Sequence, residues 1–159
     1  MGAAPMATRR EIIAHHEAGH AVAAHRLGVR IKRLSIKPDN IASGRATIGK
    51  TSDETLILII LAGPYAQKRF APHSAWRKGN TAHLTSGYDF GTVAGLIDDL
   101  HGNGTVAKLY WRYVEAKAEQ LVGQWWNEIE GVARALLERE TLTGNEMKRA
   151  ILAAHSLEV

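Results

Sequence analysis

Apolar residues near the start of the chain recur at spacings of three and four, which is the pattern of a helix with a buried face. Thr8 and Glu11 precede this pattern with the spacing of a capping box, in which each side chain accepts a hydrogen bond from the other's backbone amide. Gly28 follows the pattern as a C-terminal stop. We therefore expect a helix between Thr8 and Gly28, with residues 1–7 as a flexible lead-in.

Two short runs after this helix alternate apolar and polar residues, as strands do. Residues 31–37 form the first run, and residues 41–49 contain the second, around residues 44–48, with turn-forming residues 38–40 between the two runs. The runs predict a small sheet. Its free edge could bind an extended peptide as an added strand, or the hairpin could serve only to pack against the first helix.

A second predicted helix carries the most apolar segment of the chain. Thr51 and Glu54 have the spacing of another capping box, and residues 56–62 are apolar on every side of a helix. We expect this segment in the core. Pro64 has no backbone N–H and is expected to disturb the helix. Residues 71–84 lack a clean period and predict a loop that could act as a mobile lid.

The second half of the chain is predicted to be helical. A capping box at residues 86–89 opens one helix, and residues 105–140 have the pattern of one long amphipathic helix, bent near Gly123. The aromatic residues of this long helix are expected in the core. A last capping box at residues 143–146 opens a terminal helix. The elements predict a mainly α-helical α+β fold with a small sheet of two or three short strands.

Composition narrows the class of protein. A chain of 159 residues has the size of a single domain, 1–159, and its lack of cysteine means that any metal must be held by histidine and carboxylate. The net charge of +4 comes from scattered basic residues, which argues against a nucleic acid partner. The longest apolar run, residues 56–63, is too short to cross a bilayer of about 30 Å. Nothing resembles a signal peptide, so we expect a soluble, cytoplasmic protein with no membrane partner.

Residues 16–20 read His-Glu-Ala-Gly-His within the first predicted helix, which is the H-E-x-x-H pattern of a zincin-type active-site helix. At 3.6 residues per turn, His16 and His20 project from one face and can bind one metal ion. Glu17 lies about 100° around the helix, beside the open coordination position, where it can accept a proton from water. His15 and His25 face elsewhere or are displaced along the helix, and we expect them at the surface or in a supporting role.

A catalytic zinc ion usually takes three protein ligands and leaves a fourth position for water. The metzincin class would place its third histidine soon after the second, but residues 21–26 lack that pattern. A carboxylate from a later helix is the better candidate, and Glu54 and Asp89 each lie in the first turn of a predicted helix. His73 and His83, in the predicted loop, are the remaining alternatives.

Several stretches, in this order, resemble the peptidase domain of the FtsH family, the membrane-bound, ATP-dependent zinc metalloproteases. They are His-Glu-Ala-Gly-His-Ala at 16–21 with Leu-Gly-Val at 27–29, Leu-Ala-Gly at 61–63, Thr-Ser-Gly-Tyr-Asp-Phe at 85–90, and Leu-Thr-Gly-Asn-Glu-Met at 142–147. The first stretch is highly specific, and the order of the others strengthens the resemblance, which spans nearly the whole chain.

The resemblance implies that Asp89 is the third zinc ligand, because the family's aspartate lies at the start of a helix after a similar segment. It also implies a sheet beside the active site whose edge strand holds substrate. The family carries an ATPase module and transmembrane segments that this chain lacks, so we do not expect it to unfold substrates by itself. Pro64, Tyr65 and Gln67 interrupt a segment that in the family reads Arg-Ala-Ala-Glu, so the supporting role of that glutamate is not expected to carry over unchanged.

The resulting hypothesis is a zinc endopeptidase that cleaves unfolded or flexible polypeptides. His16, His20 and Asp89 would hold Zn²⁺, and Glu17 would be the general base. The alternative is a catalytically inactive peptide-binding module of the same fold, which would carry a damaged base or ligand that the sequence does not show. A third possibility is a domain that depends on an ATPase or unfoldase in trans, or on a ring of its own copies; the oligomeric state is left open.

Overall fold

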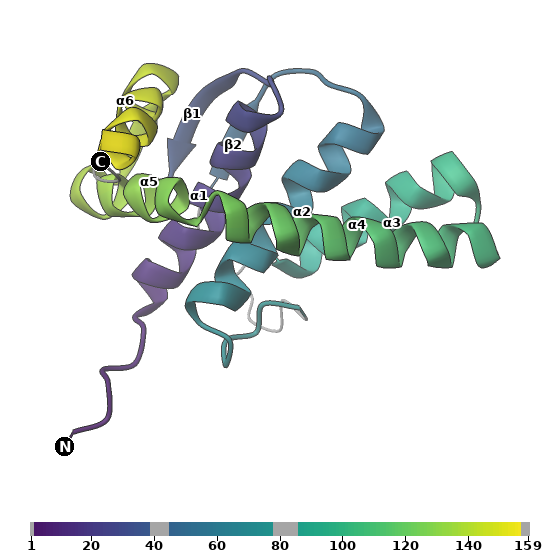
Figure 1. The fold of residues 1–159 in the computed structure, drawn as a ribbon, viewed down its shortest axis with the longest axis horizontal. Helices are drawn as coiled ribbons and strands as arrows, with labels where there is room; N and C mark the ends of the chain where they lie inside the picture. Colours follow the sequence, from purple (N-terminus) through teal and green to yellow (C-terminus); the bar gives the residue numbers. More distant parts are fainter. Residues whose placement is uncertain (1, 39–44, 78–85, 157–159) are drawn as a thin grey trace.

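The computed structural model describes residues 2–38, 45–77 and 86–156. This part of the chain is mainly helical with a small antiparallel sheet, so the predicted α+β class is confirmed (Figure 1). The elements are α1 (Arg9–Arg26), β1 (Ile31–Ser35), β2 (Arg45–Ile48), α2 (Asp53–Phe70), α3 (Ser86–His101), α4 (Thr105–Gln124), α5 (Trp126–Arg139), β3 (Thr141–Thr143) and α6 (Gly144–His155).

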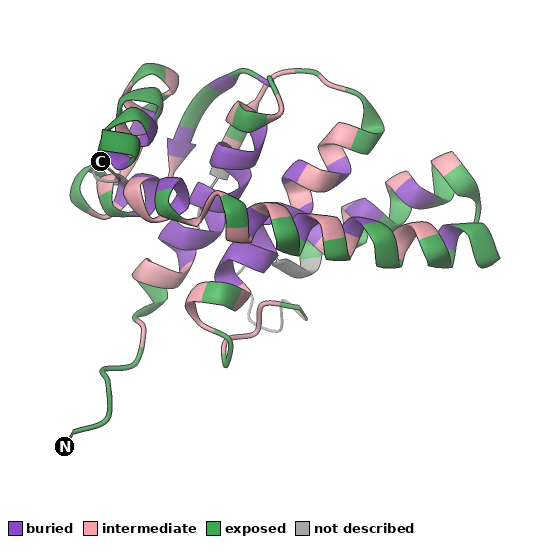
Figure 2. Cartoon of the chain, in the orientation of Figure 1, coloured by how far each residue is buried: buried purple, intermediate pink, exposed green. Residues whose placement is uncertain are grey.

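Helix α1 lies in the interior of the protein. All of its residues from 13 to 24 are buried, because α2 and α5 both pack against it (Figure 2). Gly28 follows the helix with a φ of 78°, a left-handed conformation that glycine adopts without strain. The H-E-x-x-H residues therefore lie inside the protein rather than on an outer helix face.

Helix starts follow the predicted capping chemistry in most cases. Complete capping boxes form at Thr8 and at Thr143, as expected. Helix α2 is capped by Ser52, whose side chain accepts a hydrogen bond from the amide of Thr55, and not by the expected Thr51. The predicted capping box at residues 86–89 needs the side chain of residue 86, which lies outside the part of the structure that is described.

Helix α2 continues through Pro64 to Phe70, so the expected disturbance at Pro64 is wrong. A proline inside a helix removes one backbone hydrogen bond and costs about 3 kcal/mol. Residues 61–67 are all buried, however, and the packing of this turn against α1 offsets that cost. The expected core position of residues 56–62 is confirmed for the fully buried Ile57 and Leu61, together with Ile59.

The sheet has β1 at its centre, in the order β2-β1-β3, and both neighbours run antiparallel to it. Leu34 pairs with Ala46 on one side and with Leu142 on the other. Leu34 and Leu142 are nearly inaccessible to solvent, so one face of the sheet closes the core beside α1 and α6.

The strands differ in detail from those predicted. The first is shorter than the expected residues 31–37, and the second, Arg45–Ile48, lies where residues 41–49 were expected to form a strand, around residues 44–48. The start of the second expected strand and most of the expected turn at residues 38–40 lie outside the described residues. Strand β3 was not assigned from the sequence, because three residues are too few to show an alternating pattern and their partner strand is distant in the chain.

The single helix predicted over residues 105–140 is two helices, α4 and α5, which follow one another in nearly the same direction (Figure 1). The break is at Trp125, two residues after the expected bend at Gly123. Trp125 is partly buried against the core, as expected, but Tyr113 is 60% exposed. The prediction that all aromatic residues of this segment lie in the core is therefore wrong for Tyr113.

The N-terminal residues 2–7, the expected lead-in, contain neither helix nor strand and are mostly exposed. Within the three described stretches, the helices are all too short or too polar to cross a membrane.

Candidate metal centre

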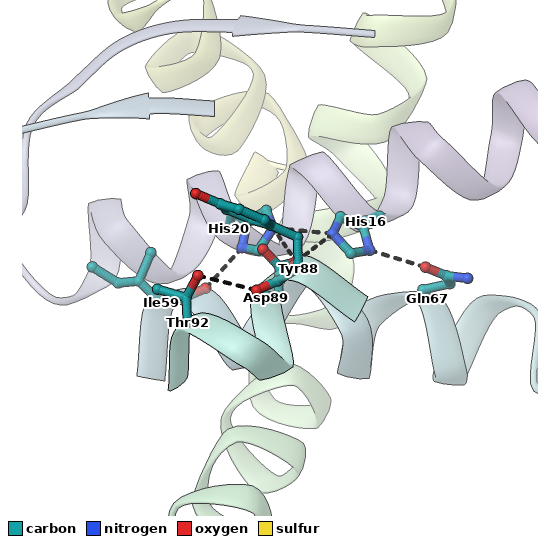
Figure 3. Close-up of polar contacts among 7 residues, drawn as sticks. All are labelled: His16, His20, Ile59, Gln67, Tyr88, Asp89 and Thr92. Atoms are coloured by element: carbon teal, nitrogen blue, oxygen red, sulfur yellow. Dashed lines mark hydrogen bonds and ion pairs between the residues drawn. The ribbon is translucent and has the colours of Figure 1, made fainter. Parts of the chain in front are cut away.

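Two histidines of α1 and an aspartate from the first turn of α3 meet at one buried point (Figure 3). Nε2 of His16 lies 2.9 Å from Oδ2 of Asp89 and 3.1 Å from Nε2 of His20, which is 3.2 Å from the same carboxylate oxygen. Among the residues that the structure describes, these are the three metal-binding side chains that converge on one another. The structure therefore brings together all three residues predicted to be metal ligands.

The spacing of the three ligand atoms suits a zinc ion. Tetrahedral zinc, with bonds of about 2.0 Å to nitrogen and carboxylate oxygen, separates its ligand atoms by about 3.3 Å. The observed separations of 2.9 to 3.2 Å need to widen only slightly to admit the ion. Two imidazole nitrogens and one carboxylate also leave a fourth position for water, as catalytic zinc sites do.

The ring of His20 is oriented by the backbone of α2. Its Nδ1 lies 2.9 Å from the carbonyl oxygen of Ile59. A carbonyl oxygen can only accept a hydrogen bond, so Nδ1 carries a proton and donates it. Nε2 then faces Asp89 and His16, which is the orientation that a metal-binding histidine requires.

The charges at this point favour a cation. Burial is the largest single effect and lowers the pKa of His20, but the charge of Asp89, its hydrogen bond to His20, the charge of Glu17 and the carbonyl of Ile59 together outweigh burial and raise that pKa to about 9. Burial likewise acts to raise the pKa of Asp89, yet the charge of His20 and hydrogen bonds from both histidines lower it to about 2. Without a metal ion, a proton on His20 therefore balances the negative charge of Asp89. A bound metal ion would balance the same carboxylate.

Glu17, the expected general base, lies inside the protein and is 2% exposed. Its negative charge acts with that of Asp89 to raise the pKa of His20 against the effect of burial, which places its carboxylate within electrostatic reach of the site. Glu17 is not a member of the converging group itself. Glu17 therefore lies near the centre, and its position beside a metal ion as the general base stays a prediction.

Two glycines allow α2 to approach the ligands closely. A Cβ at Gly63 would overlap the ring of His20, and a Cβ at Gly19 would overlap the backbone of Ala62. Any larger residue at either position would push α1 and α2 apart. The glycines of the His-Glu-Ala-Gly-His and Leu-Ala-Gly stretches therefore have a packing role next to the metal centre.

Asp89 is held in place by aromatic packing at the start of α3. The ring centroid of the adjacent Phe90 lies 6.4 Å from that of Trp76 and 6.4 Å from that of Trp111 in α4. Trp76 also lies 5.4 Å from Tyr65 of α2. Because these rings come from three helices and the segment after α2, the cluster ties the first turn of α3 to its neighbours.

The other candidates for the third ligand do not reach this centre. Glu54 is exposed at the start of α2. Its charge acts on Tyr110, whose pKa is raised mainly by burial and further by the charge of Glu54. His73 is exposed in the segment after α2 and is not part of the converging group. His83 lies outside the described residues. The structure thus favours Asp89 over Glu54 and His73.

His15 is buried, so a surface position is wrong for this residue, and the alternative of a supporting role stays a prediction. Its ring is 7% exposed and stacks on Phe70 with 3.6 Å between centroids, while Nδ1 bonds the carbonyl of Glu11. Burial lowers the pKa of His15, which favours the neutral ring. His25 is partly buried near the end of α1, and burial is also the main cause that lowers its pKa.

Gln67 contacts His16 at the centre, a supporting role that the sequence placed in doubt rather than predicted. Its side chain is inaccessible to solvent, and Oε1 lies 2.9 Å from Nδ1 of His16 on the side away from Asp89 (Figure 3). The available signal was its place after Gly63, where the FtsH family carries a glutamate. A buried polar side chain there needs a hydrogen-bond partner, and His16 is that partner.

Comparisons with known proteins do not assign a family. No protein-family model matches the chain, and no curated protein matches it either. The resemblance to the FtsH family therefore stays a prediction that rests on the residues themselves.

Proposed function

We propose that this chain is a zinc-dependent metalloendopeptidase of the FtsH-like, H-E-x-x-H type. The observation that supports the proposal is the convergence of His16, His20 and Asp89 on one buried point, with Glu17 buried near them. Two imidazole nitrogens and a carboxylate that face one point need a positive charge between them, because the buried carboxylate of Asp89 is negatively charged. A zinc ion meets that need and has the ligand set that catalytic zinc prefers.

Bound zinc would supply a Lewis acid that polarises the scissile carbonyl and lowers the pKa of water at the open position. His16 and His20 would bind through Nε2, and Asp89 through one carboxylate oxygen. Glu17 would accept a proton from the attacking water and return it to the leaving amine. Its burial near the ligands keeps this proton transfer away from bulk solvent.

Unfolded or flexible polypeptides are the proposed substrates. Strand β2 is an edge strand that pairs with β1 on one side, and no partner strand lies on its other side among the described residues. An extended peptide could pair with such an edge through its backbone. Folded proteins rarely offer a free extended segment, so they should resist cleavage unless an ATPase supplied in trans unfolds them.

Cleavage of an unfolded, fluorophore-labelled polypeptide by the zinc-loaded protein tests the proposal. The matched variant is Glu17→Gln, which keeps the shape of the side chain but cannot act as a base. We expect it to retain one zinc ion per chain and to lose about 10²- to 10⁴-fold in turnover. Glu54→Gln, which changes an exposed acid that is not part of the converging group, should cleave like the wild type.

Each result has a distinct meaning for the proposal. Equal turnover of the wild type and Glu17→Gln would rule out the proposed base. A wild type that binds zinc and peptide but does not cleave, even with an unfoldase added, would favour the peptide-binding module. A wild type that binds no zinc would overturn the metal centre.

A further inference from the structure

A chain of three hydrogen bonds leads from the backbone to the ring of His16. Ser74 Oγ donates to the carbonyl oxygen of Ala71 at 2.6 Å, and Gln67 Nε2 donates to Ser74 Oγ at 3.0 Å. Gln67 Oε1 in turn lies 2.9 Å from His16 Nδ1. Because Gln67 is completely buried, bulk water has no access to replace these partners.

The direction of each hydrogen bond follows from the backbone end of this chain. The carbonyl of Ala71 can only accept, so Ser74 must give it the single proton of its hydroxyl group. Ser74 then presents a lone pair to Gln67, which places the amide nitrogen on that side and the amide oxygen on the side of His16. The amide oxygen can only accept, so Nδ1 of His16 must carry a proton.

The consequence is that Nε2 is the nitrogen of His16 left to bind a metal ion, in place of the hydrogen bond that it donates to Asp89 without one. His20 reaches the same state by a shorter route, because its Nδ1 bonds directly to the carbonyl oxygen of Ile59. If the Gln67 amide were turned around, Nδ1 of His16 would become the acceptor. The proton of the neutral ring would then lie on Nε2 and would block metal binding.

We propose that Gln67 and Ser74 are positioning residues that hold His16 in its metal-binding tautomer, with Ser74 setting the direction of the Gln67 amide. This inference rests on the metal centre of the proposed function. The requirement for Ser74 arises because an amide has a donor end and an acceptor end and can be turned around. A carboxylate at position 67 would accept in either orientation, so it would not need Ser74 to direct it.

The proposal predicts that Ser74 and Gln67 are energetically coupled. Zinc affinity, measured by competition with a chromophoric chelator, is compared in the wild type, Ser74→Ala, Gln67→Glu and the double variant. Ser74→Ala alone should weaken zinc binding by about tenfold, the lower end of the range for groups that orient a ligand. In the Gln67→Glu background the same change should alter affinity by less than about twofold, as for independent sites.

A second substitution removes the acceptor itself. Gln67→Met changes the side-chain volume little and should weaken zinc binding by about 10- to 100-fold, whereas Gln67→Glu should bind at least as tightly as the wild type. Gln120→Met, at an exposed position of α4, is the matched control and should bind like the wild type. Circular dichroism checks that each variant is folded, and if Gln67→Met is not, the Ser74 comparison decides alone.

The results separate this inference from the proposed function. Equal zinc affinity of the wild type and Ser74→Ala, or an equal loss from Ser74→Ala in both backgrounds, would overturn the positioning role. If the wild type binds no zinc, the proposed function fails. In that case, ¹H–¹⁵N spectra of the imidazole rings without metal test the chain of three hydrogen bonds. We expect a proton signal on Nδ1 of His16 that shifts or disappears in Ser74→Ala; an unchanged spectrum would overturn the inference.

Discussion

Gly63 of α2 faces the imidazole ring of His20 in α1, and there is no room for a side chain between them. A Cβ at position 63 would come within 3.0 Å of three ring atoms of His20. The same ring is bonded through Nδ1 to the carbonyl of Ile59, one turn earlier in α2. Helix α2 therefore both contacts and orients a proposed metal ligand, and it can do so only because residue 63 is glycine.

Gly63→Ala is expected to lower the free energy of unfolding by about 1–3 kcal/mol, because the new methyl group must displace His20 or separate α1 from α2. The displacement of His20 should also weaken zinc binding. Chemical denaturation and chelator competition measure the two effects.

The matched control for this substitution is Gly95→Ala in α3, where a Cβ would meet open space. A glycine-to-alanine change at an unstrained helix position should stabilise the fold by about 0.4–1 kcal/mol and leave zinc binding unchanged. If Gly63→Ala behaves like Gly95→Ala, the close contact with His20 is not needed for the site.

Zinc is expected to stabilise the folded protein through Asp89. A ligand that binds only the folded state adds about 2.7 kcal/mol when present at 100 times its Kd, so Tm should rise with zinc concentration. Asp89→Asn keeps the shape of the side chain but removes its charge, and we expect it to lose most of this rise. Asp99→Asn, at an exposed position of the same helix, should keep the full rise in Tm. A full zinc effect in Asp89→Asn would exclude Asp89 as a ligand.

Glu146 is expected to make the stability of α6 depend on pH. Hydrogen bonds from the backbone amide and the hydroxyl of Thr143 lower the pKa of Glu146 below its ordinary value of 4.5. A carboxyl group whose pKa is lower in the folded state stabilises the fold above its unfolded pKa, and this stabilisation is lost as the pH falls through the folded pKa. Tm measured between about pH 6 and pH 3 should therefore fall less steeply in Glu146→Gln than in the wild type.

The control for the pH series is Glu138→Gln, which removes an exposed acid near the end of α5 without touching a helix cap. Its Tm should follow the wild type across the series. Parallel curves for Glu146→Gln and Glu138→Gln would show that the capping box makes no contribution to acid stability.

Glu128 is a buried carboxylate, 3% exposed, that joins three helices through an ion pair with Arg26 and a contact with Nε2 of His155. Arg26→Met should destabilise the protein by about 1–3 kcal/mol, because Glu128 loses a charged partner while His155 remains. Arg10→Met, which removes an exposed ion pair with Glu140, should cost less than about 1 kcal/mol. Chemical denaturation measures the loss of stability in each variant. Similar losses in Arg26→Met and Arg10→Met would contradict the prediction that a buried ion pair matters more than an exposed one.

Features that depend on neighbouring residues were predictable from the sequence. The capping boxes at Thr8 and Thr143 form as expected, because their hydrogen bonds link residues three positions apart. The common face of His16 and His20 follows from the helical pitch alone.

Features that depend on packing were predicted less well. Pro64 was expected to disturb α2, but the local cost of proline is offset by a buried contact with α1. Tyr113 has the spacing of a core residue, yet no described element covers that side of α4. A surface position was one of the two expectations for His15, but α1 is enclosed on all sides, which a helical pattern does not reveal.

By itself, the sequence determined that His16, Glu17 and His20 share one helix with the spacing of a zinc hydrolase, because a few residues of helix set that geometry. Only the tertiary structure decided which later side chains join them. Asp89 and Gln67 lie 73 and 51 residues after His16 along the chain. They reach its two ring nitrogens because α2 packs against α1 and α3 packs against α2. That packing depends on contacts between distant segments, which no local pattern contains.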